Sequence, residues 1–236
     1  MKERIFARER TCFDFLRSIP SKRKLVVIGG FAVSAHEFPR LSVDLDIVIP
    51  EEELKFFRKL IKDQGFVFRK EKSDFDDTYG GKYERYIKEE KLPISVDLLI
   101  NSVLARQTNY SYSFQYLFKH SEAREVRGWH PDAKVTVRVP KKEILIALKV
   151  NSMRMADKRD IIMLSYEKPD ADMIIKHLKD CPRDTILANL NELLTLVGSR
   201  DHDNSIKGVF SLSDDVLRRA VVRCEEVIRE ILERME

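Results

Sequence analysis

Residues 26–50 read V-V-I-G-G-F-A-V-S-A-H-E-F-P-R-L-S-V-D-L-D-I-V-I-P, and this stretch decides the fold. It predicts a strand, a tight turn at Gly29-Gly30 into a helix, and a second strand that carries Asp44 and Asp46. Successive side chains on a strand alternate faces, so the two aspartates share one face about 7 Å apart while apolar residues fill the other. Two carboxylates this close repel, and burying either without a partner is costly or forces protonation. A divalent cation is the simplest way to neutralise the pair.

A third acid lies on a later predicted strand. In L-P-I-S-V-D-L-L-I, residues 92–100, Asp97 stands on the face opposite an apolar row. Three oxygen ligands from neighbouring strands suit a hard octahedral cation, Mg²⁺ or Mn²⁺, with waters and substrate phosphates completing the coordination. A pair of such metals about 3.5–4 Å apart would clamp the oxygens of a phosphoryl transfer. The alternative is a polar strand edge with solvated aspartates.

The Gly29-Gly30 turn is a second candidate feature. A helix N-terminus presents unsatisfied N–H groups and partial positive charge, and glycine lets the backbone approach an anion closely. Tight turns also use glycine for steric reasons alone, so the turn points to phosphate only in combination with the aspartates. Arg40 precedes the second strand, where it could neutralise substrate phosphate or pair with Asp44.

The combination of Gly29-Gly30, Asp44-x-Asp46 and a separate Asp97 resembles the nucleotidyltransferase superfamily, which shares the fold of the DNA polymerase β palm. The string R-L-S-V-D-L-D-I-V-I, with K-K-E-I-L-I-A-L-K-V-N-S-M-R-M-A-D-K-R-D-I-I-M-L downstream, is similar to the AbiEii-type, abortive-infection branch. The resemblance covers roughly residues 20 to 170 and implies transfer of a nucleoside monophosphate from an NTP to an acceptor hydroxyl.

Residue roles follow from the resemblance. It implies that the helix begun by Gly30 holds the nucleotide phosphates, that Asp44 and Asp46 bind the metals, and that Asp97 binds metal and helps to activate the hydroxyl. Many members have Gly-Ser at the turn, whereas Gly30 supplies no side chain. Lys149, in an apolar helical run, either reaches the triphosphate or extends its stem along the core towards water.

Composition limits the class of protein. The chain has 236 residues, 43% of them hydrophobic, and a net charge of +4, so bulk charge does not indicate a nucleic-acid-binding protein. Three scattered cysteines fit a reducing compartment, and no segment has the apolar length of a membrane span or a signal peptide. We therefore expect a soluble cytoplasmic protein.

Hydrophobic periodicity predicts an α+β fold with a mixed β-sheet in a nucleotidyltransferase-like domain, residues 1–140, and a helical C-terminal region, residues 141–236. Before residue 140 we expect helices at 3–18, 30–37 and after Pro50, strands at 24–28, 43–49, 66–69, 82–88 and 94–100, a helix or long loop at 101–120, and a β-hairpin around W-H-P-D. Asp157 is a plausible N-cap of a helix at 158–167.

The sequence leaves the acceptor open among RNA, protein and small molecules. His36 could serve as a base or as a packed side chain, and the alternating aromatics from Tyr110 to Phe118 could stack on nucleobases or fill a core. The leading interpretation is a metal-dependent nucleotidyltransferase with an NTP substrate. The alternative is a non-catalytic binding or regulatory protein of a toxin–antitoxin or defence system, with a partner protein or as a homodimer.

Overall fold

A computed structural model describes the chain except residues 1, 37, 41, 43, 91 and 236, and it does not describe the side chains of residues 2–5 and 73–75. The chain forms two compact units. The first, the sheet unit, contains most of the residues up to Pro140. The second, the helical unit, begins at Lys141 and also takes in the short segments His36–Phe38 and Ala105–Tyr110.

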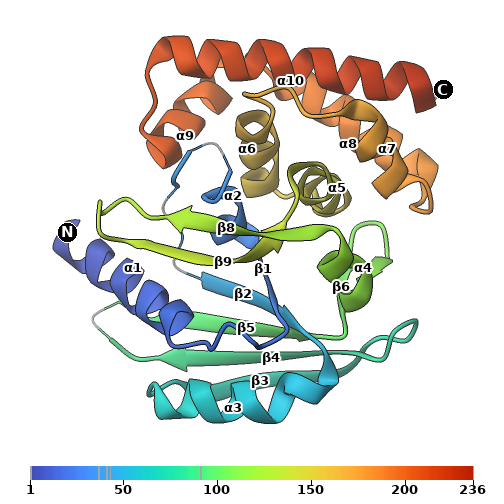
Figure 1. The fold of residues 1–236 in the computed structure, drawn as a ribbon. Coiled ribbons are helices and arrows are strands. Elements are labelled where there is room, and N and C mark those ends of the chain that lie inside the picture. The colour runs from blue at the N-terminus through green and yellow to red at the C-terminus, as the bar shows by residue number, and fades with distance from the viewer. Residues whose placement is uncertain (1, 37, 41, 43, 91, 236) are drawn as a thin grey trace. The chain divides into compact units, whose positions relative to one another are not determined.

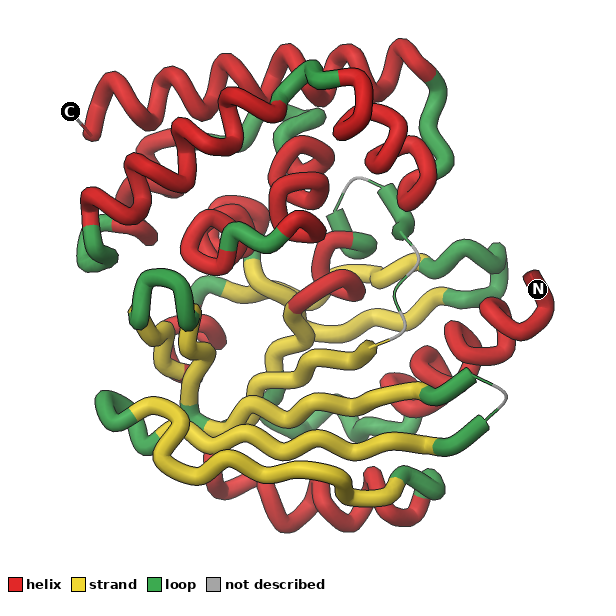
Figure 2. Tube along the Cα trace, turned by 180° about the vertical axis from the view of Figure 1, so that it is seen from behind, coloured by secondary structure: helices red, strands yellow, loops and turns green. Residues whose placement is uncertain are grey.

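The sheet unit is built on a five-stranded mixed sheet with strand order β1-β2-β5-β4-β3 (Figures 1 and 2). Its strands are β1 (Val26–Ile28), β2 (Asp44–Ile49), β3 (Val67–Asp76), β4 (Gly81–Lys88) and β5 (Ile94–Ile100). The central pair, β2 and β5, is parallel, and the other neighbours are antiparallel. This arrangement confirms the predicted α+β class with a mixed sheet.

Alternation along the two central strands explains how the sheet buries one face. Leu45, Ile47, Val96 and Leu98 are fully buried, as expected for period-two apolar positions that face a core. Helix α3 (Leu54–Asp63), preceded by the short 3-10 turn η1 (Glu51–Glu53), lies along the sheet (Figure 1). The opposite face of β2 and β5 carries the aspartates.

A charged network joins α3 to the sheet. Arg58 on α3 donates through Nε at 3.0 Å to Glu84 on β4, and the hydroxyl of Tyr86 also donates to this carboxylate. Glu84 is fully buried, and a buried carboxylate needs such partners to stay ionised. Since residues 84 and 85 point to opposite faces of β4, this network lies on the other side of the sheet from Arg85.

Smaller elements complete the sheet unit: α1 (Lys2–Arg17), α2 (Gly29–Val33), β6 (Ser102–Ala105), β7 (Tyr110–Ser113), α4 (Phe114–Lys119), β8 (Ser121–Arg127) and β9 (Lys134–Pro140). The predicted hairpin is confirmed as β8 and β9, which pair antiparallel. α1 packs on β9, and buried Glu9 accepts hydrogen bonds from the backbone N–H groups of Trp129 and His130. The carboxylate of Glu9 thereby fixes the hairpin turn against α1.

The length of one predicted helix and the form of segment 101–120 differ from the structure, and the start of one predicted strand is not tested. The helix predicted at 30–37 ends at Val33, and residue 37 lies outside the described residues. Residue 43, where the second strand was predicted to begin, also lies outside them. The segment 101–120 is neither one helix nor a loop, because β6, β7 and α4 share it.

The helical unit contains α5 (Lys142–Ser152), α6 (Met155–Leu164), α7 (Ala171–Leu178), α8 (Arg183–Leu196), α9 (Arg200–Phe210) and α10 (Asp214–Met235). The long α10 contacts α6, α7, α8 and α9, and Figure 1 shows it running across them. Its buried positions, including Leu217, Cys224, Ile228 and Ile231, recur at helical spacing and form an apolar seam along one side of the helix. The seam is therefore used for packing inside this unit.

Asp157 is not the N-cap that we predicted. Helix α6 starts at Met155, Arg154 occupies the N-cap position, and Asp157 at the third helical position accepts a hydrogen bond at 3.1 Å from the backbone N–H of Arg154. The carboxylate therefore closes the first turn from inside the helix, in the manner of a capping box.

Within the part of the chain that the structure describes, none of the helices has both the length and the apolar character needed to cross a bilayer.

Candidate active site

Two of the predicted aspartates and one arginine form a row across the sheet. Asp46 on β2 pairs with Asp97 on β5, which pairs in turn with Arg85 on β4. Side chains directly opposite one another on neighbouring strands point to the same face. In the adjacent row Asp44 lies opposite Ser95, whose hydroxyl donates at 2.6 Å to Oδ1 of Asp44. The structure thus brings Asp44, Asp46 and Asp97 to one face of two adjacent strands.

The glycine turn closes directly onto this row. Gly29 follows Ile28, the residue opposite Asp46, and has a φ of +66°, a left-handed conformation that favours glycine. A Cβ at Gly29 would overlap Oδ2 of Asp46, and a Cβ at Gly30 would overlap the Arg40 guanidinium and the Ser42 hydroxyl. Gly29 is therefore favoured by its backbone conformation as well as by the contact, whereas a larger residue at Gly30 would have to displace the ends of the Arg40 and Ser42 side chains. Arg40 and Ser42 fill the space that a serine at position 30 would need.

Asp97 is the most enclosed of the three aspartates. Its side chain is 6% exposed, whereas Asp44 is exposed and Asp46 is half-buried. Arg85 donates from Nε to Oδ1 at 2.8 Å and from Nη2 to Oδ2 at 2.6 Å, so its planar guanidinium engages both carboxylate oxygens. These hydrogen bonds raise the pKa of Arg85, which stays protonated at any physiological pH.

Tyr83 belongs to the same face of β4 as Arg85, two residues away. Burial, the larger cause, and the negative charge of Asp97 together raise the pKa of the Tyr83 hydroxyl to about 12, while Arg85 opposes the shift. The phenol is therefore neutral and close enough to Asp97 to respond to its charge. Tyr83 and Arg85 together enclose the third aspartate.

The donor chemistry fits a divalent cation only in part. Asp44 and Asp46 offer carboxylate oxygens, the ligands that Mg²⁺ and Mn²⁺ prefer, at the accessible end of the row. Both carboxylate oxygens of Asp97 accept hydrogen bonds from Arg85. Consistent with this, no group of three or more His, Cys, Asp or Glu side chains among the described residues is arranged to hold a metal ion. Asp44 and Asp46 are therefore the more accessible candidate ligands, and Asp97 could not bind a cation without moving Arg85.

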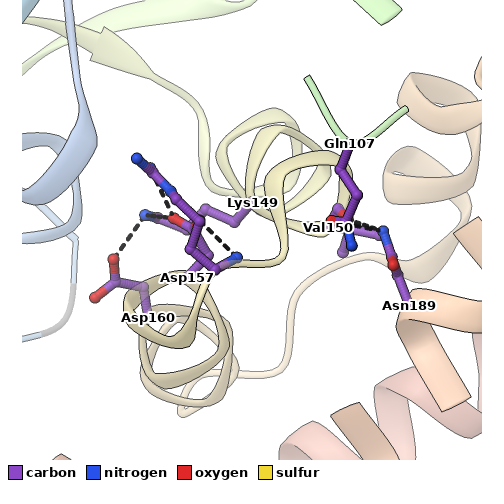
Figure 3. Close-up of polar contacts among 7 residues, drawn as sticks. Gln107, Lys149, Val150, Asp157, Asp160 and Asn189 are labelled. Carbon is purple, nitrogen blue, oxygen red and sulfur yellow. Dashed lines mark hydrogen bonds and ion pairs between the residues drawn. The ribbon is translucent and has the colours of Figure 1, made fainter. Parts of the chain in front are cut away.

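Lys149, predicted to contact nucleotide, belongs to the helical unit. Its Nζ lies 2.6 Å from Oδ2 of Asp160 and 3.2 Å from Oδ1 of Asp157, and its side chain is 5% exposed (Figure 3). Burial by itself would raise the pKa of Asp157, but Lys149 and Arg154 hold it below its ordinary value. The Lys149 ammonium is thus already neutralised by two buried carboxylates, and its contact with nucleotide stays a prediction.

The same close-up shows a second polar contact of the helical unit. Asn189 on α8 donates at 2.8 Å to the backbone carbonyl of Val150 on α5 (Figure 3). Val150 directly follows Lys149, so this hydrogen bond ties the end of α5 to α8 beside the charged cluster. The ion pairs of Lys149 and the hydrogen bond to Val150 together hold Lys149 in a buried position inside the helical unit.

Two other sequence candidates are placed as follows. His36 falls in a short segment assigned to the helical unit, and its role as a base stays a prediction. The aromatic run is divided between β7 and α4, where Tyr112 and Phe114 are buried. That burial favours a packing role for these two rings over base stacking.

Sequence reasoning missed Arg85, Tyr83, Ser95 and Ser42. Their residue types are ordinary for a strand or loop, and only the strand register brings Arg85 and Ser95 opposite aspartates. The one available signal was the alternation K-Y-E-R-Y-I-K at 82–88, which places residues 83 and 85 on one face.

The sheet, its row of aspartates and the glycine turn define the class: an α+β protein with a nucleotidyltransferase-like fold. Two solved structures are similar to it. One is a Helicobacter pylori protein described as a candidate nucleotidyltransferase, 15% identical, with a TM-score of 0.54 and 100% of this chain and 97% of that chain covered. The other is JHP933 from Helicobacter pylori, 15% identical, with a TM-score of 0.54 and coverage of 99% and 94%. At this identity the likeness concerns the fold and does not single out the AbiEii-type branch.

No family model matches the sequence, and no curated protein matches it either.

Proposed function

We propose that the protein is a nucleotidyltransferase that moves a nucleoside monophosphate from an NTP to an acceptor hydroxyl with the help of Mg²⁺ or Mn²⁺. One observation carries the proposal: Asp44, Asp46 and Asp97 lie on one face of adjacent strands, beside a glycine turn that touches Asp46. Structural aspartates have no reason to gather there, because neighbouring carboxylates repel.

Each residue has a distinct part in the proposal. Asp44 and Asp46 would hold the divalent cation, which when bound neutralises phosphate charge and orients the triphosphate. The Arg40 guanidinium beside Gly30 would contact phosphate oxygens. Lys149 remains a further candidate for phosphate contact if its ion pairs with Asp157 and Asp160 can open.

The chemical step is an in-line displacement. The acceptor oxygen forms a bond to the α-phosphorus, the bond from that phosphorus to the bridging oxygen of the β-phosphate breaks, and pyrophosphate leaves. We assign Asp97 to orient the acceptor hydroxyl and to take its proton. Because both Asp97 oxygens accept hydrogen bonds from Arg85, this role requires the guanidinium to release at least one oxygen. Arg85 is 43% exposed, so it has room to move outward.

The test is transfer of label from each α-labelled NTP, with Mg²⁺ or Mn²⁺, to total RNA, to protein and to small hydroxyl compounds. Asp46→Asn should reduce transfer by at least about a hundredfold, the scale on which lost electrostatic stabilisation usually acts. Asp63→Asn, the same substitution at the exposed end of α3, is the matched control and should leave transfer unchanged. Full transfer by Asp46→Asn would contradict the proposal.

A second candidate function is a non-catalytic binding or regulatory protein, for example in a toxin–antitoxin pair of the AbiEii type. The observation that favours it is the Arg85–Asp97 ion pair, which uses both oxygens of the third carboxylate. A binding protein would retain NTP in equilibrium dialysis and label no acceptor. In either case we expect a cytoplasmic protein, with a protein partner or a second copy of the chain as further candidates.

A further inference from the structure

We infer that Arg85 supplies, at Asp97, the positive charge that a second divalent cation would supply, so that the site binds one divalent cation, through Asp44 and Asp46. The inference rests on the proposed function. It makes Arg85 a positioning residue, because it acts on the site through Asp97.

The first argument is geometric. Arg85 and Asp97 are directly opposite on antiparallel strands β4 and β5, so the sheet register itself sets their distance. The two hydrogen bonds, at 2.8 and 2.6 Å, have the parallel arrangement that a guanidinium and a carboxylate favour. The pair is therefore built into the sheet.

The second argument concerns charge. Asp97 has Asp46 opposite it on one side and Arg85 opposite it on the other. Without Arg85, two carboxylates would face each other across adjacent strands, and the more enclosed one would need protonation or a cation. Arginine is permanently protonated, so it removes this need at any physiological pH.

The third argument is competition for the same oxygens. A cation bound by Asp97 would have to displace two charge-assisted hydrogen bonds and would then lie near the displaced guanidinium, whose charge repels it. Asp44 is exposed and Asp46 half-buried, whereas the Asp97 side chain is 6% exposed, and the Ser95 hydroxyl donates to Oδ1 of Asp44 and orients its carboxylate. The accessible pair Asp44 and Asp46 therefore binds a divalent cation more readily than Asp97 does.

The test is a titration of the full chain with Mn²⁺ alone, in which the electron paramagnetic resonance signal of free Mn²⁺ gives the number of bound ions. Wild type should bind one ion, and Arg85→Gln should bind two, because Asp97 gains a vacant pair of oxygens beside Asp46. Arg85→Lys keeps the charge and should bind one. Asp46→Asn should lower Mn²⁺ affinity by more than about tenfold, since even residues that only support metal ligands cost about ten- to a hundredfold.

Asp97→Asn is the decisive variant if Arg85→Gln does not fold. It should bind one Mn²⁺ with wild-type affinity, because Asp97 is not a ligand in this scheme. Loss of the ion in Asp97→Asn, two ions in wild type, or a single ion in folded Arg85→Gln would each overturn the inference. Two ions in a wild-type protein that transfers label would refute the inference alone. If the wild-type protein binds no Mn²⁺ and transfers no label, both the inference and the proposed function are refuted.

Discussion

Replacing Lys149 with methionine tests whether the buried ion pairs of α5 and α6 hold the helical unit together. Lys149→Met keeps an unbranched side chain one atom shorter but removes the ammonium that lies 2.6 Å from Asp160 and 3.2 Å from Asp157. The three side chains are at most 5% exposed, so water cannot replace the lost charge. Removing one partner of a buried ion pair costs about 3–5 kcal/mol, because the buried carboxylate loses the ammonium that compensates its charge. Arg154 still pairs with Asp157 at 2.8 Å, so the loss falls mainly on Asp160.

The assay is urea unfolding of the full chain, followed by far-UV circular dichroism, which reports helix content. With a urea m value of about 2 kcal/mol/M, we expect the midpoint of the helical transition to fall by about 2 M. Lys168→Met is the matched control, because Lys168 pairs with Glu230 at 3.0 Å but is 45% exposed. Loss of that exposed pair should cost at most about 1 kcal/mol.

A double-mutant cycle separates the ion pair from the side chain's packing. Asp160→Asn removes the buried charge that Lys149→Met leaves behind, so the double variant should be more stable than the sum of the single effects predicts. If Lys149→Met unfolds within about 1 kcal/mol of wild type, or if the cycle shows no coupling, the reasoning from burial and charge is refuted. Lys149 would then be available for another task, and its predicted contact with nucleotide would gain weight.

Two further predictions concern a glycine and a histidine. Gly29→Ala should destabilise the sheet unit more than Gly80→Ala in thermal or urea unfolding, because both have positive φ, +66° and +60°, but only the Cβ at 29 meets Asp46. The backbone part of each cost is about 1–3 kcal/mol, and equal costs would contradict the clash. Burial and, secondarily, the charge of Arg159 lower the pKa of His202 below its ordinary 6.5, so protons bind the unfolded chain more readily. Stability should therefore fall with a slope of up to about 1.4 kcal/mol per pH unit as pH drops below that value, and His202→Gln should remove this component from pH-dependent urea unfolding.

The strands that carry the aspartates could be predicted from the sequence because their apolar residues alternate without interruption. Leu45 and Ile47 on one strand, and Val96 and Leu98 on another, fix which way Asp46 and Asp97 face, since a shift by one residue would expose four fully buried side chains. The mixed sheet and the shared face of the aspartates follow from that constraint.

The residues that neutralise the buried charges could not be predicted from the sequence, because these ion pairs depend on strand register and on contacts between helices. The sequence shows Arg85 as one of many basic residues, and only its position opposite Asp97 distinguishes it. Asp157 was predicted to start a helix, yet it lies inside the first turn and pairs with Lys149, eight residues earlier. Segment 101–120 was ambiguous because alternating aromatics suit a strand and a helix equally, and the chain uses both.

Each of the two units neutralises a buried charge with side chains of opposite sign. Comparing the two clusters indicates which acids are the better candidates to bind a cation. In the helical unit a buried cation, Lys149, is neutralised by two acids; in the sheet unit a buried acid, Asp97, is neutralised by one cation. A residue whose charge is satisfied internally gives up that pairing when it binds a ligand, so such a residue contributes less to affinity than one that faces solvent. Asp44 is exposed and Asp46 half-buried, so both are more accessible to a cation from solvent than Asp97 is. In the proposed reaction the first metal contact would therefore belong to these two carboxylates, and the position of Arg85 would decide when Asp97 takes part.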